Sequence, residues 1–302
     1  MTRIMARRML TTKTKVSLAS LAYRCIRTGR AFAGKDNRAI VRRGGIRWCL
    51  DLSEGIDFSI YLLGAFERST ASTLDKLTKP GDVVFDVGAN VGAHTLRLAR
   101  SVGPTGKVVA FEPADLAFVK LQRNLGLNPE LLSRTSAHQL FLAAAPGAHS
   151  QSEIYASWPL ESDCSVHPKH RGRLVTASNA STDTLDHFVA RERIERLNLI
   201  KIDVDGQELP VLQGGLAVLA KFRPILVMEM SPYVHAEQHN SFAALVALLR
   251  DGGYSIQNAH TWKPLPLEAA VLEAIIPDGA SINVITRPKQ SPLFLEPLAP
   301  AP

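Results

Sequence analysis

Cysteine is scarce in this sequence, whose 302 residues include only Cys25, Cys49 and Cys164. So few cysteines, and an odd number of them, argue against a disulfide framework and favour a reducing compartment, so we expect a cytoplasmic protein. Long apolar runs are also missing: no 18 consecutive apolar residues occur, so we expect no membrane-spanning helix. The remaining composition, 46% hydrophobic and 21% charged, is typical of a globular domain with a sizeable core.

Acidic residues are absent from the first 35 positions. Residues 1–47 carry thirteen Lys or Arg and one acid, a net charge of +12, whereas the rest of the chain carries −5. The overall charge of +7 therefore comes from the N-terminus. A basic face across the main domain is not expected, and neither is a nucleic-acid partner.

Residues 1–45 are predicted to form a basic N-terminal extension that contains an amphipathic helix. The apolar residues that fall on one face at helical spacing are Leu18, Leu21, Ala22, Cys25 and Ile26. Three interpretations remain open. Residues 1–35 could contact an anionic membrane surface, so that the protein is peripheral to the membrane; they could be an Arg-rich transit peptide; or they could be a helix or lead-in packed on the domain.

Between this extension and a proline-rich tail over 288–302, strand patterns alternate with helix patterns. The tail has five prolines in fifteen residues, which excludes a regular helix. A β-hairpin is predicted over 46–63, around a Ser-Glu-Gly turn. Strands are predicted at 83–87, 107–111, 138–145, 197–202, 224–230, 254–258 and 281–286. Helices are predicted at 69–78, 89–99, 115–127, 184–194, 208–220 and 242–250.

This alternation of apolar strands with helices predicts an α/β fold: a mostly parallel, seven-stranded sheet with helices on both faces. Such sheets bind ligands at the carboxyl ends of their strands. The functional residues are therefore expected directly after the predicted strands.

The first strand ends in a glycine-containing loop, Asp86–Gly92. Gly88 and Gly92 permit tight turns and a close approach of the backbone to a ligand. The loop departs from the dinucleotide fingerprint because Asn90 stands at the second glycine position. The second strand is followed by Glu112, an acid suited to accept hydrogen bonds from the two hydroxyls of a ribose. The alternatives are a plain strand-to-helix turn and an exposed acid at a strand end.

Four sequence blocks follow one another along the chain: Lys79–Gly92, Gly106–Pro113, Leu185–Asp186 with Leu199–Glu208 and Leu212, and Pro224–Glu229. In this order they resemble class I S-adenosylmethionine-dependent methyltransferases, and more narrowly the FkbM family. The family usually has Glu where this chain has Asp205. The resemblance covers about residues 46–287, predicted to be the methyltransferase domain.

The resemblance implies a Rossmann-like fold and S-adenosylmethionine as the cofactor. It also implies that the adenine lies near residues 143–145. The acceptor would be a small molecule or glycan, methylated on a hydroxyl oxygen of a sugar or a secondary metabolite. The residues implied to bind the cofactor are Asp86, Gly88, Ala89, Asn90, Gly92, Glu112 and Pro113.

Methyl transfer to an alcohol gains from a base, because a hydroxyl group is a weak nucleophile. The candidate catalytic residues are Asp203, His94 and Glu229, and the candidate substrate contacts are Asp205, Glu208 and His167. Asp205 could instead cap the following helix, and His94 could simply pack against the loop.

The long connection over 146–182 is predicted to be a substrate lid. Cys164, His167 and His170 have the spacing of metal ligands, but no second cluster completes four ligands, so no metal is expected.

Two other functions remain open. One is an NAD(P)-dependent oxidoreductase, which Asn90 at the middle glycine position disfavours. The other is a non-catalytic, methyltransferase-like binding module at a membrane surface. The sequence indicates neither the acceptor nor the oligomeric state.

Overall fold

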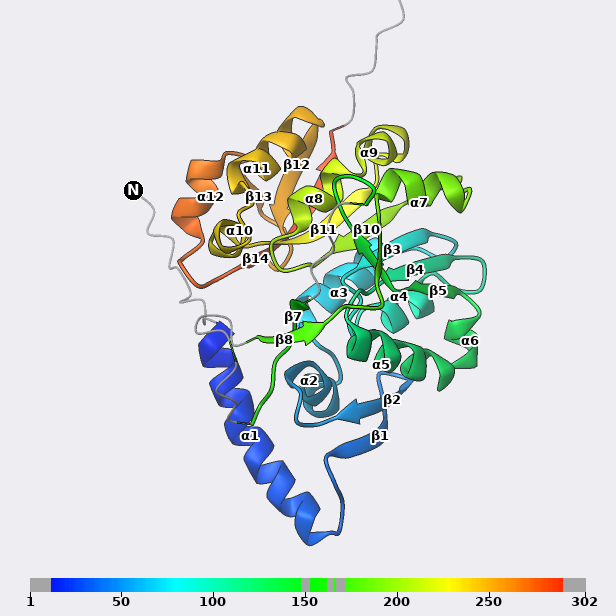
Figure 1. Cartoon of the computed structure of the whole chain (residues 1–302), viewed down its shortest axis with the longest axis vertical. Helices are drawn as coiled ribbons and strands as arrows, with labels where there is room; N and C mark the ends of the chain where they lie inside the picture. Colours follow the sequence, from blue (N-terminus) through cyan, green and yellow to red (C-terminus); the bar gives the residue numbers. More distant parts are fainter. Residues whose placement is uncertain (1–11, 148–152, 162–165, 167–171, 290–302) are drawn as a thin grey trace, which may run out of the picture.

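The protein is seen here in a computed structural model that describes residues 12–147, 153–161, 166 and 172–289 (Figure 1). Its centre is an eight-stranded sheet in the order β13-β12-β14-β11-β10-β3-β4-β5. The five strands from β11 to β5 are parallel, and β14, β12 and β13 are added antiparallel. The strands are β3 (Val83–Val87), β4 (Lys107–Phe111), β5 (Thr135–His138), β10 (Leu199–Ile202), β11 (Ile225–Met230), β12 (Tyr254–Asn258), β13 (Pro264–Leu265) and β14 (Ile282–Pro288).

Helices cover both faces of this sheet. Successive strand residues point to opposite sides, so strands that are apolar throughout present an apolar surface on each face. Val84 and Val108 pack into one buried cluster, and Phe85 and Val109 pack into the other. The first cluster takes side chains from α3 (Arg68–Leu77), α4 (Thr95–Ser101), α5 (Asp115–Gly126) and α6 (Pro129–Leu132). The second takes them from α7 (Leu185–Arg191), α8 (Glu208–Gln213), α9 (Leu216–Phe222), α11 (Phe242–Asp251) and α12 (Ala269–Ile275).

The prediction of a hairpin over 46–63 is wrong. The hairpin lies earlier, where β1 (Arg38–Arg43) pairs antiparallel with β2 (Ile46–Asp51). Gly44 and Gly45 make its turn with φ of 56° and 80°, a conformation that glycine adopts without strain. Residues 55–63 instead form a helix, α2 (Gly55–Leu63). A short apolar run fits a buried helix as well as a strand, so periodicity alone could not separate the two.

Four further boundaries differ from those predicted. The main sheet has eight strands rather than seven because β13 adds two residues at its edge. The strand expected at 138–145 lies earlier, as β5 (Thr135–His138), and β6 (Leu140–Leu142) pairs outside the main sheet with β9 (Ser181–Asp183). The helix expected at 89–99 begins only at Thr95, since the residues before it form the loop. The helix expected at 208–220 is broken into α8 and α9.

The predicted lid region contains a second antiparallel pair, β7 (Glu153–Ser157) and β8 (Arg173–Thr176). The segment that follows β7 is joined to the start of α2 by backbone hydrogen bonds. The Gly55 N–H donates to the Trp158 carbonyl at 2.8 Å, and the Leu160 N–H donates to the Ser53 carbonyl at 2.8 Å. Cys164, His167 and His170 lie outside the described residues.

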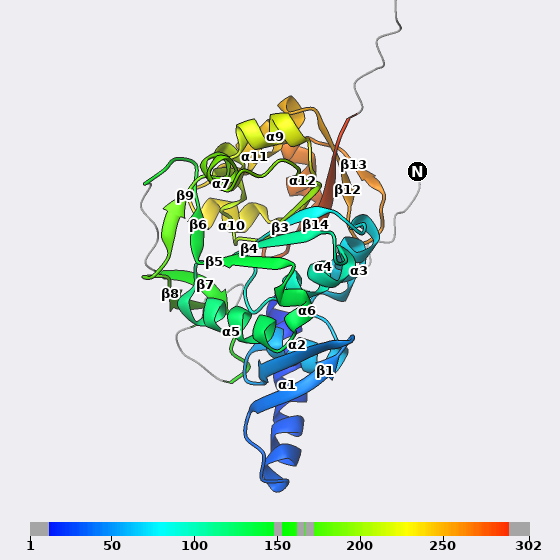
Figure 2. The same ribbon diagram turned by 90° about the vertical axis from the view of Figure 1, so that its right-hand side faces the viewer.

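The N-terminal extension does contain a helix, α1 (Thr12–Phe32). Figure 2 shows it projecting from the sheet beside the β1–β2 hairpin. Its Tyr23 is only 1% exposed and packs edge-to-face on Phe58 of α2, with ring centroids 5.8 Å apart. The Tyr23 hydroxyl donates to Glu161 Oε1 at 2.8 Å, and Arg27 donates to the same oxygen. In the described part of the chain, neither α1 nor another helix is long and apolar enough to cross a membrane.

Candidate active site

The loop after β3 folds tightly against the loop after β10. Gly88 has φ 77°, and a Cβ atom placed there would lie 1.9 Å from the Asp203 carbonyl oxygen. Only glycine therefore allows the two loops to approach this closely. Asn90 also adopts a left-handed conformation, with φ 48°. The N–H groups of Gly88 and Ala89 both donate to the Phe111 carbonyl at 3.0 Å, which ties the loop to β4.

A buried lysine contacts both of these loops. Lys201, in β10, is 3% exposed, and its Nζ donates to the Gly88 carbonyl at 2.8 Å. It also lies 3.2 Å from Asp86 Oδ1 and 3.6 Å from Asp203 Oδ2. Burial alone would lower the pKa of Lys201, but these two carboxylates raise it above its ordinary value. The lysine is thus a charged partner for both loops.

Glu112 accepts two backbone hydrogen bonds at the end of β4. Its Oε2 accepts from the Asn90 N–H at 2.7 Å, and its Oε1 accepts from the Ala114 N–H at 2.8 Å. Burial raises the pKa of Glu112 to about 7, although both hydrogen bonds act to lower it. Each oxygen keeps a lone pair that can accept a ligand hydroxyl.

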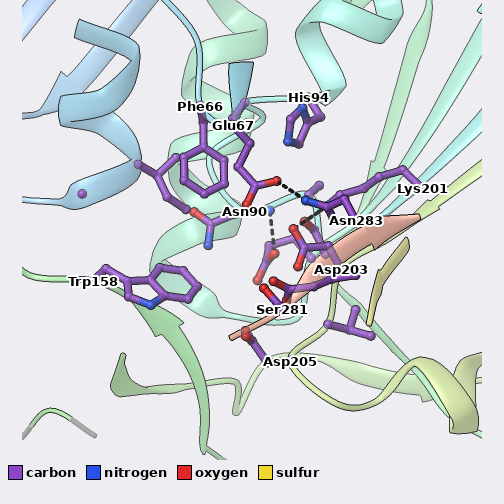
Figure 3. A pocket seen from close by; sticks show the side chains of 18 of the residues that line it. Phe66, Glu67, Asn90, His94, Trp158, Lys201, Asp203, Asp205, Ser281 and Asn283 are labelled. Atoms are coloured by element: carbon purple, nitrogen blue, oxygen red, sulfur yellow. Dashed lines mark hydrogen bonds and ion pairs between the residues drawn. The ribbon is translucent and has the colours of Figure 1, made fainter. Parts of the chain in front are cut away.

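A cavity of about 810 Å³ opens above these groups, at the carboxyl ends of the parallel strands. Four further carboxyl side chains line it, from Glu67, Asp203, Asp205 and Glu229. Figure 3 shows those of Glu67, Asp203 and Asp205 in one part of the cavity, and the charges of these three groups act on Glu229. Glu67 is the residue directly before α3, and its Oε2 accepts a hydrogen bond from Asn283 Nδ2 of β14 at 3.1 Å.

Two of these carboxyls, Glu229 and Asp205, have a raised pKa. Poor solvation raises the pKa of Glu229 well above its usual value, and the charges of Asp203, Glu67 and Asp205 add to this effect. Poor solvation likewise raises the pKa of Asp205, followed by the charges of Asp203 and Glu208. The cavity therefore contains carboxyl groups that bind protons more tightly than a solvated acid does.

His94 lines the same cavity at the start of α4, beside the ring of Phe66. It is 4% exposed, and neither ring nitrogen has a hydrogen-bond partner among the described residues. Burial, helped by the charges of Lys201 and Arg97, lowers the pKa of His94 to about 3. Its imidazole is therefore neutral near pH 7 and is a weak proton acceptor.

Some predicted site residues lie beneath the cavity instead of lining it. Asp86 is fully buried, accepts from Thr95 Oγ1 at 2.6 Å and pairs with Lys201. Gly92 has φ 90° and sits tightly against Leu96 and Leu121. The remaining predicted cofactor residues, which do line the cavity, are Gly88, Ala89, Asn90, Glu112 and Pro113.

The predicted substrate contacts are likewise divided. Asp205 lines the cavity, whereas Glu208 accepts from the Val204 and Gly206 N–H groups, and its Oε2 lies 3.2 Å from Nε2 of buried His235 in α10 (Pro232–Glu237). His167 lies outside the described residues. Near the expected adenine position, residues 140–142 line the cavity, and residues 143–145 do not.

Sequence reasoning missed Glu67, Lys201 and Asn283. A lysine inside the apolar strand Leu199–Ile202 was a usable signal, because a buried cation requires an anionic partner. Glu67 and Asn283 carried no such signal, because 216 positions separate them in the chain.

Comparison with known proteins identifies the family. The model of the methyltransferase FkbM domain matches residues 86–256, more than half of the chain. The chain belongs to the FkbM methyltransferase family. The match does not favour the alternative of an NAD(P)-dependent oxidoreductase.

Several curated relatives of this FkbM-family methyltransferase are methyltransferases too. Methyltransferase 1 of Beauveria bassiana is 28% identical over 63% of this chain and 80% of its own length. The 2-O-methyltransferase NoeI of Sinorhizobium fredii is 25% identical over 49% of this chain and 63% of its own length. The 31-O-demethyl-FK506 methyltransferase FkbM of Streptomyces tacrolimicus is 29% identical over 59% of this chain and 74% of its own length.

S-adenosylmethionine is the cofactor of this FkbM-family enzyme, and the residues of the site fit it. The cradle at Gly88 leaves no room for a side chain, and Asn90 presents an amide to the cavity beside it. Glu112 offers a buried carboxyl with free lone pairs, as a ribose requires. Leu140 and Leu142 supply an apolar wall beyond Pro113, suited to a flat aromatic base.

Proposed function

We propose that this methyltransferase transfers the methyl group of S-adenosylmethionine to a hydroxyl oxygen of a neutral, polyhydroxylated acceptor, such as a sugar or a glycan. The observation that carries this proposal is the convergence of Glu67, Asp203, Asp205 and Glu229 on the cavity beside the cofactor loop. An ionised carboxylate accepts hydrogen bonds and a protonated carboxyl also donates one, so this cluster matches hydroxyl groups, which do both.

The charge of this part of the cavity supports a neutral acceptor over an anionic one. Four carboxyls line it, and the buried cation Lys201 already pairs with Asp86 and Asp203; the other lining cation, Arg68, is exposed. The ionised members of the cluster would repel a carboxylate or phosphate on the acceptor. Transfer to oxygen is further supported by NoeI and FkbM, whose names describe O-methyltransferases.

When bound, S-adenosylmethionine supplies an electrophilic methyl group. Glu112 and Asn90 hold the cofactor, and the carboxyl cluster orients the acceptor. Glu229 is the proposed base, because its raised pKa makes it a better proton acceptor than an ordinary carboxylate. It removes the hydroxyl proton as the oxygen reacts. Asp203, positioned by Lys201, accepts a second hydroxyl of the acceptor, and neutral His94 packs against Phe66.

A substrate series tests the acceptor class. Methyl transfer from labelled S-adenosylmethionine would be compared for a neutral glycoside, the matching uronic acid and the matching amino sugar, with the methylated atom located by NMR. We expect O-methylation of the neutral glycoside at a kcat/KM at least tenfold above that of the uronic acid. Preference for the uronic acid, or methylation on nitrogen, would contradict the proposal.

A variant tests the role of Glu229. Glu229→Gln should lower kcat by about 10²- to 10⁴-fold, the usual contribution of a positioned base, and leave the Kd of S-adenosylhomocysteine unchanged. Glu237→Gln is the matched control, because Glu237 lies at the end of α10 and does not line the cavity. Full turnover by Glu229→Gln would remove Glu229 as the base.

A further inference from the structure

The cavity continues from the carboxyl cluster into an apolar part between α1 and α2, two helices that lie side by side (Figure 1). We call this part the apolar branch. The residues that define it are Leu18, Ala19 and Ala22 of α1, Leu62 and Leu63 of α2, and Phe66. Phe66 of the branch and Glu67 of the carboxyl cluster are consecutive residues that both line the cavity, so the branch and the cluster are neighbouring parts of it.

The walls of the apolar branch are held in place. Buried Tyr23 fixes α1 through its ring contact with Phe58 and its hydrogen bond to Glu161. The hydrogen bond between the Gly55 N–H and the Trp158 carbonyl fixes the start of α2 against the predicted lid. The space between the two helices is thus part of the folded structure.

The mouth of the branch exposes leucines to solvent. Leu18 is 58% exposed, Leu62 48% and Leu63 52%. Single exposed leucines are ordinary, but several on adjacent helices around one cavity mark a binding surface. The six residues that define the branch are all apolar, whereas the carboxyl cluster and the exposed Arg68 line other parts of the cavity. A ligand that fits both parts has a polar head and an apolar chain.

We propose that the apolar branch binds a hydrocarbon chain of an amphiphilic acceptor whose hydroxylated head lies in the carboxyl cluster. This inference rests on the proposed function, because it specifies the acceptor of the same site. The chain follows Phe66 outward between Leu18 and Leu62, and the reacting hydroxyl stays beside the cofactor loop.

Chain length provides the test. Octyl and methyl β-D-glucopyranoside would be titrated into the S-adenosylhomocysteine complex by calorimetry, below the micellar concentration of the octyl compound. Each methylene that is fully removed from water strengthens binding by about fourfold. We therefore expect the octyl compound to bind at least tenfold more tightly. Equal affinities would overturn the inference, and the substrate series above would still decide the proposed function by itself.

Two leucines of one helix make a matched pair of variants. Leu18 lines the branch, whereas Leu21 is 64% exposed on the same helix and does not. Leu18→Asp should reduce the preference for the octyl compound at least fivefold, and Leu21→Asp should preserve it; both should bind S-adenosylhomocysteine normally. If instead both variants keep the preference and both lose binding to phosphatidylglycerol vesicles, these leucines contact a lipid surface and the inference is wrong.

Discussion

At the scale of single residues, the site depends on buried charges with defined partners. Glu112 keeps a carboxyl in an apolar environment because two backbone N–H groups bind it, and its pKa is nevertheless raised to about 7. Lys201 is a buried cation between two acidic residues. The contribution of Glu112 to cofactor binding should therefore depend on pH, and the contribution of Lys201 to stability should depend on its carboxylate partners.

Cofactor affinity should depend on pH through Glu112. Ribose hydroxyls donate to the ionised carboxylate, so binding favours the form that exists above the free-enzyme pKa of about 7. The affinity for S-adenosylhomocysteine should be constant above about pH 7 and should fall below it, by at most about tenfold per pH unit. Calorimetry between pH 5.5 and 8.5 checks this. Glu112→Gln should bind more weakly and without this dependence; a flat wild-type profile would contradict the prediction.

Lys201→Met should destabilise the protein by about 3–5 kcal/mol, because it leaves the buried carboxylate of Asp86 without its cationic partner. Urea unfolding measures this change. The double variant Asp86→Asn with Lys201→Met should be less destabilised than the sum of the two single variants. Lys221→Met, at the end of α9, is the control and should change stability by less than about 0.5 kcal/mol. A Lys201→Met protein as stable as this control would show that the pair contributes nothing.

At the scale of elements, two strand-to-helix connections fit against each other. The loop after β3 and the loop after β10 touch at Gly88 and Asp203, and each contains a residue with positive φ, Asn90 or Asp205. This contact brings the cofactor loop and the carboxyl cluster to one edge of the sheet. The chemistry thus depends on the spacing between two neighbouring parallel strands.

Gly88→Ala should separate these loops. The new Cβ would overlap the Asp203 carbonyl in a conformation already unfavourable for alanine, so we expect a loss of about 2 kcal/mol or more in stability and loss of cofactor binding. Gly126→Ala, in α5, is the matched control, because nothing lies within 4 Å of its Cβ position and alanine favours helix. Thermal unfolding with and without S-adenosylhomocysteine compares them. Normal cofactor binding by Gly88→Ala would contradict this account.

At the scale of the whole molecule, α1 is part of the folded domain. The basic composition of residues 1–45 suggested an extension, but Tyr23 is buried against α2 and hydrogen-bonded to the predicted lid region. One helix therefore helps to wall a cavity whose chemistry lies mainly at the strand ends of the sheet. Whether residues 1–35 contact a membrane stays a prediction.

Tyr23→Ala should cost about 3 kcal/mol in the free energy of unfolding, because it removes a buried ring and its hydrogen bond. Phe32→Ala, in the same helix, is the control: Phe32 is 90% exposed, so its removal should change stability by less than about 0.5 kcal/mol. Denaturant unfolding of the two variants decides the point. Equal stabilities would mean that α1 is only loosely attached.

The sequence by itself determined the cofactor half of this protein. Gly88, Asn90 and Glu112 follow consecutive strands of one βαβ unit, and parallel strands bring their carboxyl ends to the same edge. The alternation of strands and helices was enough to predict the fold, and the resemblance of the motif blocks to the FkbM family implied the family and S-adenosylmethionine. The short run at 57–63 was misread because apolar residues over so few positions fit a helix and a strand equally well.

Only the tertiary structure brings together the residues of the proposed acceptor half. Glu67 meets Asn283 across 216 positions, and Leu18 of α1 shares a cavity with Glu229 of β11. No local pattern encodes such contacts, because they depend on which helices cover the sheet and at which edge β14 is added. The proton affinity of Glu229 also depends on the tertiary structure, because it is set by the burial of this side chain and by the approach of three other carboxyls in space.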